Sequence, residues 1–482
     1  MKLTMDSTIR LQNVPKELLK QIKEELTLEN PMFMRKKRMG VPTWGEPRLI
    51  KLWSERDING EKQYILSRGY MDRLLELFAS GALVWEVNDL RVKVTPVTFC
   101  SNIQLRNYQK DLVNAMTRTN QGIGVAPCGS GKTQCALEVI ARNEQPTLWI
   151  THTRDLLKQS MDRAIEVLGL TGNQVGVIAA EAFKMGTHIT FATVQTLSKR
   201  DLSGIVDKFG CIVIDEAHRA FKDYAKSRMF DSVISQFPAY YRYGLTASEH
   251  RSDGLIETMY HLIGPKIFEV AQKHLNSQGN VMVPKVYFVE TGFEYNQPVD
   301  EDGEKEMLSV QQLFKAMRED IRRNRLIMDC LNHQKCGDFV LVLGDSLAHL
   351  QELSVTVSCL NELPAAFISG ETPKQKREKS MDDVRAGRYN YLFATYQLAK
   401  EGLDIPCLNT LILLTPKKDK AIIQQSVGRI CRIFEGKKTP VVYDFWDSKV
   451  KQCNYWARER AKVYRDLGCR VEGGPKLRGG RK

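Results

Sequence analysis

The chain has 482 residues, of which 43% are hydrophobic and 26% charged, and this length favours two or three domains over one. No apolar run is long enough to span a bilayer, and residues 1–6 lack the apolar core of a signal peptide, which argues against a membrane protein. Seventy Lys and Arg against 57 Asp and Glu give a formal net charge of +13, which favours a polyphosphate partner such as nucleic acid.

Residues 1–98 read as a small α+β accessory domain that binds DNA. A helix is expected to begin at Pro15, because proline is favoured in the first helical turn. The basic run Arg35-Lys36-Lys37-Arg38 and the nearby Trp44 have the composition of a nucleic-acid loop. A solvated charged face is at least as good an interpretation of the same run.

The remainder of the chain predicts two tandem α/β lobes. Apolar strand-like runs alternate with helical stretches, a pattern typical of parallel sheets covered by helices on both faces. We expect the first lobe over residues 99–275, a hinge over 272–280 and the second lobe over 282–448. An acidic surface loop is expected at 300–306. Residues 449–482 predict a basic helix, packed on the second lobe, and a disordered tail. The strand-like runs are 147–150, 188–191, 211–214, 242–245, 285–289, 339–343, 391–393 and 410–414.

The strongest local signal is a phosphate-binding loop at residues 126–133. It follows an apolar run and precedes a predicted helix, which is the context that a P-loop requires. Glycines let successive backbone N–H groups face a phosphate, a lysine reaches the terminal phosphates, and a hydroxyl suits Mg²⁺. Position 126 is Ala where the usual pattern has Gly. The residues expected to bind ATP are Pro127, Cys128, Gly129, Ser130, Gly131, Lys132 and Thr133, the last also holding Mg²⁺.

A pair of carboxylates ends the apolar run Cys211-Ile212-Val213-Ile214, which continues as Asp215-Glu216-Ala217-His218. Open α/β sheets bind ligands at the carboxyl ends of their strands. Asp215 is expected to hold Mg²⁺, and Glu216 to orient or deprotonate the water that attacks the γ-phosphate. His218 is expected to relay contacts toward the second lobe. Acidic capping of a strand end is the alternative, but it does not explain the preceding P-loop.

Residues 103–432 resemble the superfamily 2 helicases. The resemblance rests on the P-loop, Asp-Glu-Ala-His, and the segments 105–109, 245–248 and 424–432. It implies two RecA-like P-loop lobes that use ATP and Mg²⁺. Within the superfamily, the layout is most similar to XPB-like helicases and to UvsW-type phage helicases that migrate DNA branches.

The resemblance assigns further residues to the nucleotide and to coupling. Arg106 and Gln109 lie in the segment similar to the one that reads adenine. Gly402 and Asp404 would approach the nucleotide from the second lobe. Thr246 and Ser248, with His218, would couple the carboxylates to the bound strand. The residues that the resemblance implies in sequence-independent DNA contact are Thr153, Arg154, Thr193, Gln195, Thr196, Ser346 and Thr395.

The segment Gln424 to Arg432 resembles the one that supplies arginine fingers. Gln424 is included among the catalytic residues. Arg429 and Arg432 stand three residues apart, so on one helix they would share a face and enter the cleft between lobes together. Such a cation is typically worth about 10³ to 10⁵ in rate.

The resulting prediction is an ATP-dependent DNA helicase that unwinds or branch-migrates forks and four-way junctions, moving 3′ to 5′. An RNA-remodelling helicase and a restriction-type duplex translocase remain open as alternatives. A clamp that binds nucleic acid without hydrolysing ATP is a third. We expect a location in the cytoplasm or nucleoid, or in the host cytoplasm if the chain comes from a phage.

Overall fold

The chain forms two compact units in this computed structural model. One comprises Met1–Pro127 and Gly131–Val270, and the other Cys128–Ser130 and Ala271–Lys482. The structure describes residues 1–58, 60–81, 84–127, 129–220, 224–247, 256–271, 275, 281–297, 309–334, 337–360, 364–403 and 405–476. Cys128, Ser248, Asp404, the acidic loop 300–306 and, except for residue 275, the hinge 272–280 lie outside these residues. Among the helices described, none has the length and apolar character needed to cross a membrane.

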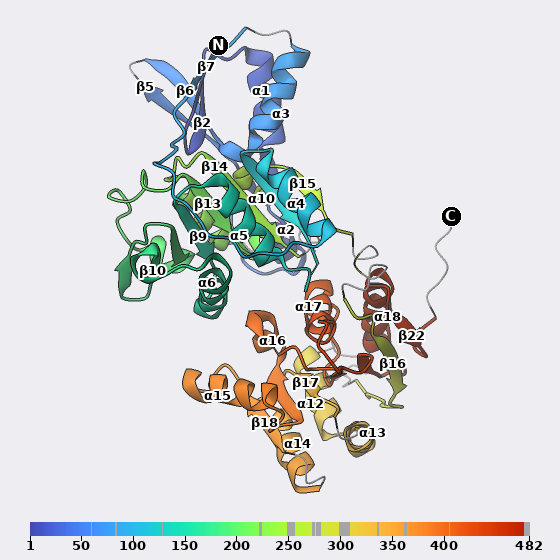
Figure 1. The fold of residues 1–482 in the computed structure, drawn as a ribbon. Coiled ribbons are helices and arrows are strands. Elements are labelled where there is room, and N and C mark those ends of the chain that lie inside the picture. Colours follow the sequence, from blue (N-terminus) through green and yellow to red (C-terminus); the bar gives the residue numbers. More distant parts are fainter. Residues whose placement is uncertain are drawn as a thin grey trace. The chain divides into compact units, whose positions relative to one another are not determined.

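The N-terminal domain is a five-stranded sheet with two helices packed on it (Figure 1). The strands follow the order β5-β6-β2-β1-β7 and are antiparallel except for β1 and β7. Ile9, Leu11, Ile22, Leu74 and Phe78 form its core, which joins the sheet to α1 and α3. The elements are β1 (Lys2–Met5), β2 (Thr8–Gln12), α1 (Lys16–Glu25), β3 (Thr27–Glu29), α2 (Pro31–Arg38), β4 (Leu49–Lys51), β5 (Trp53–Ile58), β6 (Glu61–Ser67), η1 (Arg68–Tyr70), α3 (Met71–Ser80) and β7 (Glu86–Asp89).

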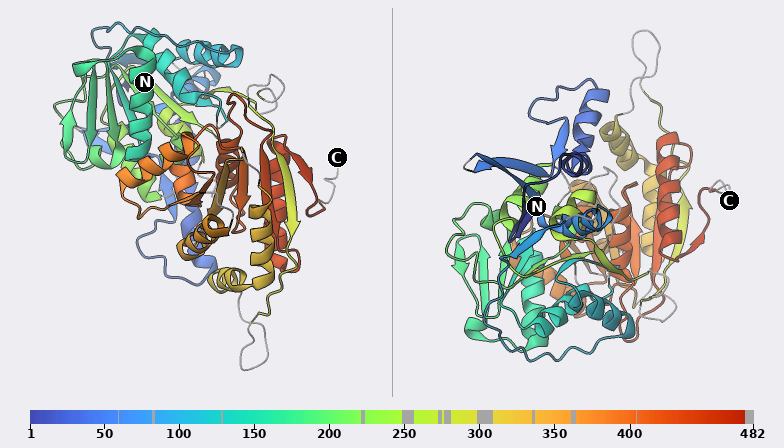
Figure 2. Two further views of the ribbon diagram at one scale, coloured as in Figure 1. Left: turned by 60° about the horizontal axis from the view of Figure 1, so that its bottom comes forward. Right: turned by 90° about the horizontal axis from the view of Figure 1, so that it is seen from above.

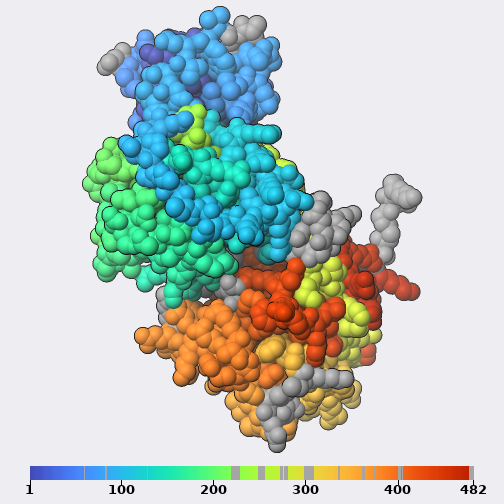
Figure 3. Space-filling model, viewed as in Figure 1, coloured from blue at the N-terminus to red at the C-terminus, as the bar shows by residue number. Residues whose placement is uncertain are grey.

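A buried arginine fastens this domain to the first α/β lobe. The Arg68 guanidinium donates to Gln121 Oε1 at 2.9 Å and to the carbonyls of Ala239 and Tyr240 at 2.5 and 2.6 Å. In the opposite direction, Arg242 of the lobe donates to the carbonyl of Ser7 at 3.0 Å. The two parts also adjoin in the space-filling view (Figure 3). The predicted accessory domain is therefore integrated with the first lobe by buried polar contacts.

The first lobe is an eight-stranded sheet in the order β11-β10-β12-β9-β13-β14-β8-β15, parallel except for β10 and β11. Strands β9, β12 and β13 are buried along their whole length, which explains why most of their residues are apolar. The elements are α4 (Asn107–Thr117), β8 (Gln121–Val125), α5 (Lys132–Asn143), β9 (Thr147–Thr151), α6 (Arg154–Leu168), η2 (Gly172–Gln174), β10 (Val175–Ala179), β11 (Ala182–Lys184), β12 (Ile189–Thr193), α7 (Val194–Leu197), β13 (Cys211–Ile214), α8 (Ala217–Ala220), α9 (Tyr224–Ile234), β14 (Tyr241–Thr246), α10 (Ile256–Ile263) and β15 (Lys266–Glu269).

The second lobe is a seven-stranded, wholly parallel sheet in the order β18-β19-β17-β20-β21-β16-β22. Two α/β lobes were predicted, and the structure confirms them; Figure 2 shows further views. The elements are β16 (Lys285–Glu290), α12 (Val310–Glu319), α13 (Ile321–Asn332), β17 (Val340–Gly344), α14 (Leu347–Leu360), β18 (Ala365–Ile368), α15 (Lys374–Arg385), β19 (Tyr391–Thr395), α16 (Tyr396–Gly402), β20 (Thr410–Leu413), α17 (Lys420–Ile430), β21 (Val441–Trp446), α18 (Lys451–Asp466) and β22 (Arg470–Glu472).

The C-terminal helix α18 packs on the second lobe. Arg460 forms a two-pronged ion pair with Asp444 of β21, at 2.8 and 2.7 Å, and the Tyr464 hydroxyl donates to the same carboxylate at 2.6 Å. All three side chains are buried. β22 then joins the sheet beside β16, so regular structure of this lobe continues past residue 448. From the expected tail, residues 477–482 lie outside the described part.

Candidate active site

The predicted P-loop connects strand β8 to helix α5. Gly129 and Gly131 have φ angles of 82° and 77°, a left-handed conformation that glycine adopts without strain. Helix α5 begins at Lys132, and its side-chain amine donates to the carbonyl of Pro127 at 3.5 Å. The Lys132 amine thus lies beside the backbone of the P-loop. The N-terminus of α5 is also there, and a helix N-terminus favours a bound anion.

Gln109 contacts this loop from helix α4. Its side-chain oxygen accepts from the backbone N–H of Arg106 at 2.9 Å, which fixes the amide orientation. The other end of the amide lies against Gly131, since a Cβ there would stand 2.4 Å from Gln109 Nε2. The segment predicted to read adenine is therefore adjacent to the P-loop.

Asp215 and Glu216 follow the buried strand β13. Asp215 accepts from the Ser160 hydroxyl at 3.3 Å and from the Glu216 backbone N–H at 2.9 Å. Burial, together with the neighbouring Glu216 carboxylate, raises the pKa of Asp215 to about 6, while the charge of Lys132 opposes the shift. The positive charge of Lys132 thus favours the ionised form of the Asp215 carboxylate. A buried carboxylate is the kind of ligand that Mg²⁺ prefers.

Glu216 has a strained backbone, with φ of 50°. Only a few per cent of non-glycine residues adopt positive φ, and such strain concentrates at functional sites. Its carboxylate lies 3.3 Å from His218 Nδ1. The strain and this contact orient the Glu216 side chain at the end of the strand.

Thr246 connects the carboxylate segment to the P-loop. Its hydroxyl lies 2.9 Å from His218 Nδ1, and its carbonyl accepts from the N–H of Ala126 at 3.0 Å. Thr246 is fully buried at the end of β14, which pairs directly with β8. One residue thus contacts both sequence motifs.

The structure corrects the expected geometry of the two arginines. Helix α17 ends at Ile430 and is capped by Cys431, so Arg432 lies beyond the helix and does not share a helical face with Arg429. Arg429 donates to the carbonyls of Ala399 and Leu403, both at 3.0 Å. It therefore holds the end of α16, which includes Gly402, within the second lobe. Gln424 is half-buried on α17.

Several residues predicted to touch DNA also cap local backbone. Thr153 and Thr395 accept from the N–H groups of Leu156 and Leu398 at the starts of α6 and α16. Ser346 accepts from His349 N and from Arg318, at 3.3 and 3.1 Å. Thr193 contacts Thr196 at 2.9 Å, and the Thr196 hydroxyl accepts from the N–H of Ala180 at 3.1 Å. Gln195 donates to the His152 carbonyl at 3.0 Å, and Arg154 is exposed.

Sequence reasoning missed Ser160 as a partner of Asp215. Ser160 lies on the buried face of α6 with Leu157 and Ala164, three and four residues away. A hydroxyl on an otherwise apolar helical face was the available signal. It stabilises one oxygen of the carboxylate.

The N-terminal domain presents an exposed basic surface. The last turn of α2 carries Arg35, Lys37 and Arg38, all exposed, and the Trp44 side chain is 94% exposed. Lys36 is instead paired with Glu46 at 3.2 Å. The basic run is thus helical, although a loop was one interpretation of its composition.

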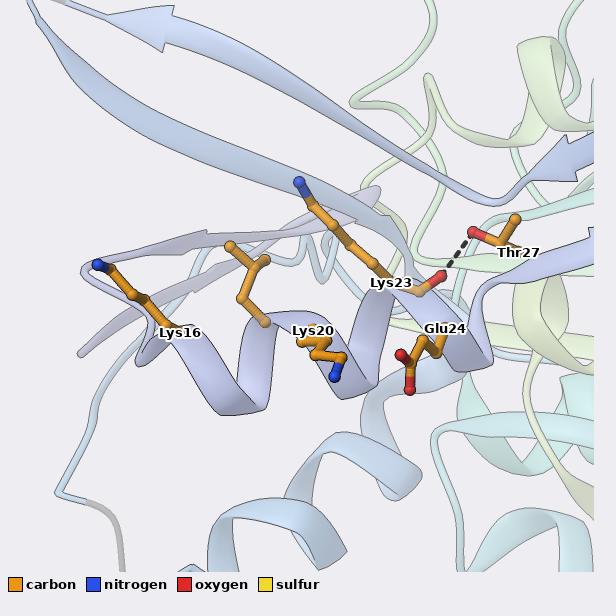
Figure 4. Close-up of a pocket in the computed structure, with 6 residues that line it drawn as sticks. Lys16, Lys20, Lys23, Glu24 and Thr27 are labelled. Atoms are coloured by element: carbon orange, nitrogen blue, oxygen red, sulfur yellow. Dashed lines mark hydrogen bonds between the residues drawn. The ribbon is translucent and has the colours of Figure 1, made fainter.

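A second group of basic side chains lies on α1 and lines a shallow hollow (Figure 4). The lining residues are Lys16, Lys20 and Lys23, together with Leu19, Glu24 and Thr27.

Two protein families match the two lobes. The family described as type III restriction enzyme, res subunit, matches residues 102–251, and the helicase conserved C-terminal domain family matches residues 322–434. The solved structure of a Saccharomyces cerevisiae Dbp5 variant bound to RNA is similar, with a TM-score of 0.53 at 15% identity. It covers 76% of this chain and 88% of that chain. At this identity the likeness shows the fold, two RecA-like domains.

Two curated relatives differ in the nucleic acid that their names suggest. A putative ATP-dependent RNA helicase of Acanthamoeba polyphaga mimivirus is 27% identical over 341 residues, 70% of this chain. The XPB helicase/translocase subunit of the general transcription and DNA repair factor IIH of Schizosaccharomyces pombe is 25% identical over 365 residues, 71% of this chain. The chain spans 62% and 43% of their respective lengths.

Proposed function

We propose that this chain, a superfamily 2 helicase with two RecA-like domains, is a DNA motor that unwinds or branch-migrates forks and junctions. Both family matches and the relatives imply an ATP-dependent nucleic-acid helicase. Its DEAH-box placement, movement from 3′ to 5′, and role in replication, recombination or repair belong to the proposal. The likeness to UvsW-type helicases stays a prediction.

The observation that carries the proposal is the set of contacts around Thr246. Its hydroxyl contacts His218, its carbonyl binds the start of the P-loop, and His218 also contacts Glu216. We expect a change at the phosphates to reach His218 and Glu216 through these contacts, and from there the strand ends where a polynucleotide would bind. Coupling of this kind distinguishes a motor from a simple nucleotide-binding domain.

The site residues have distinct roles in ATP hydrolysis. Lys132 would bind the terminal phosphates, and Glu216 would orient the attacking water or take its proton. Asp215 and Thr133 would hold Mg²⁺, which supplies positive charge to the phosphates when bound. Arg432 would stabilise charge on the transferred phosphoryl group, and Arg429 would keep the end of α16 in place.

Support for DNA comes from the XPB relative and from the exposed surface of the N-terminal domain. Arg35, Lys37 and Arg38 offer phosphate contacts, and the exposed Trp44 ring offers a face on which a base can stack. We expect Trp44→Ala to weaken single-stranded DNA binding about tenfold. Tyr455→Ala, also at an exposed aromatic ring, is the matched control. Equal affinity in the two variants would exclude Trp44 from the interface.

The second candidate function is RNA remodelling, which the name of the mimivirus relative favours. The positive charge of the chain suits both polymers. Neither sheet nor P-loop geometry discriminates between them, because sequence-independent motors contact phosphates.

The deciding experiment measures steady-state ATPase with single-stranded DNA, a fork, a four-way junction and matched RNA, together with strand release from each. Stimulation by branched DNA with strand displacement supports the proposal. Stimulation of the ATPase by RNA alone would support the second candidate function, RNA remodelling. Hydrolysis without strand release would indicate a duplex translocase, and binding without hydrolysis a clamp.

A further inference from the structure

We propose that Lys437 is a positioning residue for ATP hydrolysis, whose side chain ties the main chain at Arg432 to the segment that follows α16. This inference rests on the proposed function, in which Arg432 faces the transferred phosphoryl group. Lys437 itself is not expected to touch ATP.

The geometry is a double hydrogen bond from one amine. Lys437 Nζ donates to the carbonyl of Arg432 at 2.8 Å and to that of Pro406 at 2.9 Å. A turn returns the side chain to residue 432: the N–H of Lys437 donates to the Phe434 carbonyl at 3.1 Å, and Gly436 has φ of 72°. The amine therefore bridges two segments separated by 26 positions in the sequence, from 406 to 432.

Arg432 needs such a tie because it lies outside the helix. Helix α17 ends at Ile430, so the carbonyl of Arg432 has no place in the helical hydrogen-bond ladder. The preceding carbonyl, of Cys431, accepts from the N–H of Met282 at 2.8 Å. Arg429, within the helix, binds Ala399 and Leu403 instead. Lys437 thus holds the main chain at Arg432 in place, as the helical hydrogen bonds of α17 hold the main chain at Arg429.

The surroundings of Lys437 make the tie sensitive to pH. Burial, with a smaller effect of the Arg432 charge, lowers the pKa of Lys437 to about 8, while the thiols of Cys431 and Cys407 act in the opposite direction. Above that pH the amine keeps N–H donors but loses the charge that strengthens both hydrogen bonds. The bridge should then weaken while the protein stays folded.

The test compares Lys437→Met, Lys437→Arg and, as a matched control, Lys438→Met. Lys438 is the exposed neighbour, paired with Asp338 at 2.8 Å. In Lys437→Met we expect kcat for ATP hydrolysis to fall at least about tenfold, because a displacement of about 1 Å can cost on the order of 10²-fold. KM for ATP should change less than about twofold. Lys437→Arg should recover most of kcat, and Lys438→Met should retain it.

A pH profile separates positioning from mere stability. Wild-type kcat should decline as pH rises through about 8, the pKa of Lys437, whereas Lys437→Arg should lack this decline because guanidinium does not titrate there. Melting curves establish that each variant is folded. Unchanged kcat in a folded Lys437→Met, or the same alkaline decline in Lys437→Arg, would overturn the assignment.

Hydrogen exchange gives a readout that does not depend on catalysis. Amides near Pro406 and Arg432 should exchange faster in Lys437→Met than in wild type or Lys438→Met. If the wild type hydrolyses no ATP with any polynucleotide, the proposed function fails, and with it the catalytic part of this inference. The exchange rates then still decide whether Lys437 holds the main chain near Pro406 and Arg432. Equal exchange rates in Lys437→Met and wild type would reject this structural role too.

Discussion

Gln109 occupies the space where a side chain on residue 131 would stand. A Cβ built on Gly131 would be 2.4 Å from Gln109 Nε2, and Gly131 has φ of 77°. We expect Gly131→Ala to weaken ATP binding about tenfold or more, because it both strains the loop and displaces Gln109. Binding of a fluorescent ATP analogue measures this effect.

Gly169→Ala is the matched control for that substitution. Gly169 has φ of 60°, but nothing lies within 4 Å of a Cβ there. It should lose about 1–2 kcal/mol of stability from strain alone and keep its affinity for ATP. Equal ATP affinity in both variants would show that the Gln109 contact is immaterial.

Lys132→Ala should abolish turnover and leave DNA binding largely intact. The P-loop amine is expected to bind the terminal phosphates, so hydrolysis should fall at least on the order of 10²-fold. The control is Lys110→Ala, at an exposed lysine of α4. ATPase rates and DNA affinity are measured on the same preparations, and retained hydrolysis in Lys132→Ala would refute the P-loop assignment.

His261 should make the first unit sensitive to acid. Burial lowers the pKa of His261 to about 4, and its ring lies 5.4 Å from that of Tyr70. The folded pKa is below the unfolded one, so burying neutral His261 becomes costly in acid. The contribution of His261 to the free energy of unfolding is fully present above about pH 6.5 and is lost as pH falls toward 4. The loss should be on the order of 1–2 kcal/mol, less than the full shift gives, because the ring is only partly buried.

Denaturant unfolding at several pH values checks this prediction. His261→Phe keeps a ring beside Tyr70 and should remove the acid-dependent loss. His333→Gln, at an exposed histidine of the second lobe, should leave it unchanged. The same pH slope in His261→Phe would assign the effect to other groups.

Arg68→Ala should destabilise the first unit strongly. It leaves Gln121, the buried carbonyl of Ala239 and the partly buried carbonyl of Tyr240 without their donor, and such a loss costs about 3 kcal/mol or more. Arg73→Ala, at an exposed arginine paired with Glu25, should cost less than about 1 kcal/mol. The free energy of unfolding of each variant is the measurement. Similar values for the two would show that the Arg68 contacts are not stabilising.

The sequence was most informative where the structure is buried and local. Strand β13 matches the predicted run Cys211–Ile214, because a strand buried on both faces is apolar throughout. The P-loop could also be predicted from local sequence, because its glycines, its lysine and the start of the helix are neighbours in the chain. Both signals depend on residues a few positions apart.

Features that depend on distant contacts were not predictable in this way. Nothing in the sequence near Arg429 indicates that α17 ends at Ile430. The prediction that Arg429 and Arg432 share a helical face was therefore wrong. Arg68 looked like one more basic residue, because its partners lie 53 and about 170 positions away. The role of Ser160 likewise depends on a carboxylate 55 positions along the chain.

The acceptors of Arg68 also have an evolutionary consequence. Two of the three are main-chain carbonyls, at Ala239 and Tyr240, and a carbonyl is present whatever amino acid occupies the position. Mutational drift at 239 and 240 therefore leaves the guanidinium with its acceptors. Only Gln121 contributes a side chain, and its amide also donates to the Arg68 carbonyl at 3.2 Å. Among relatives that keep this junction, positions 68 and 121 should change together or not at all.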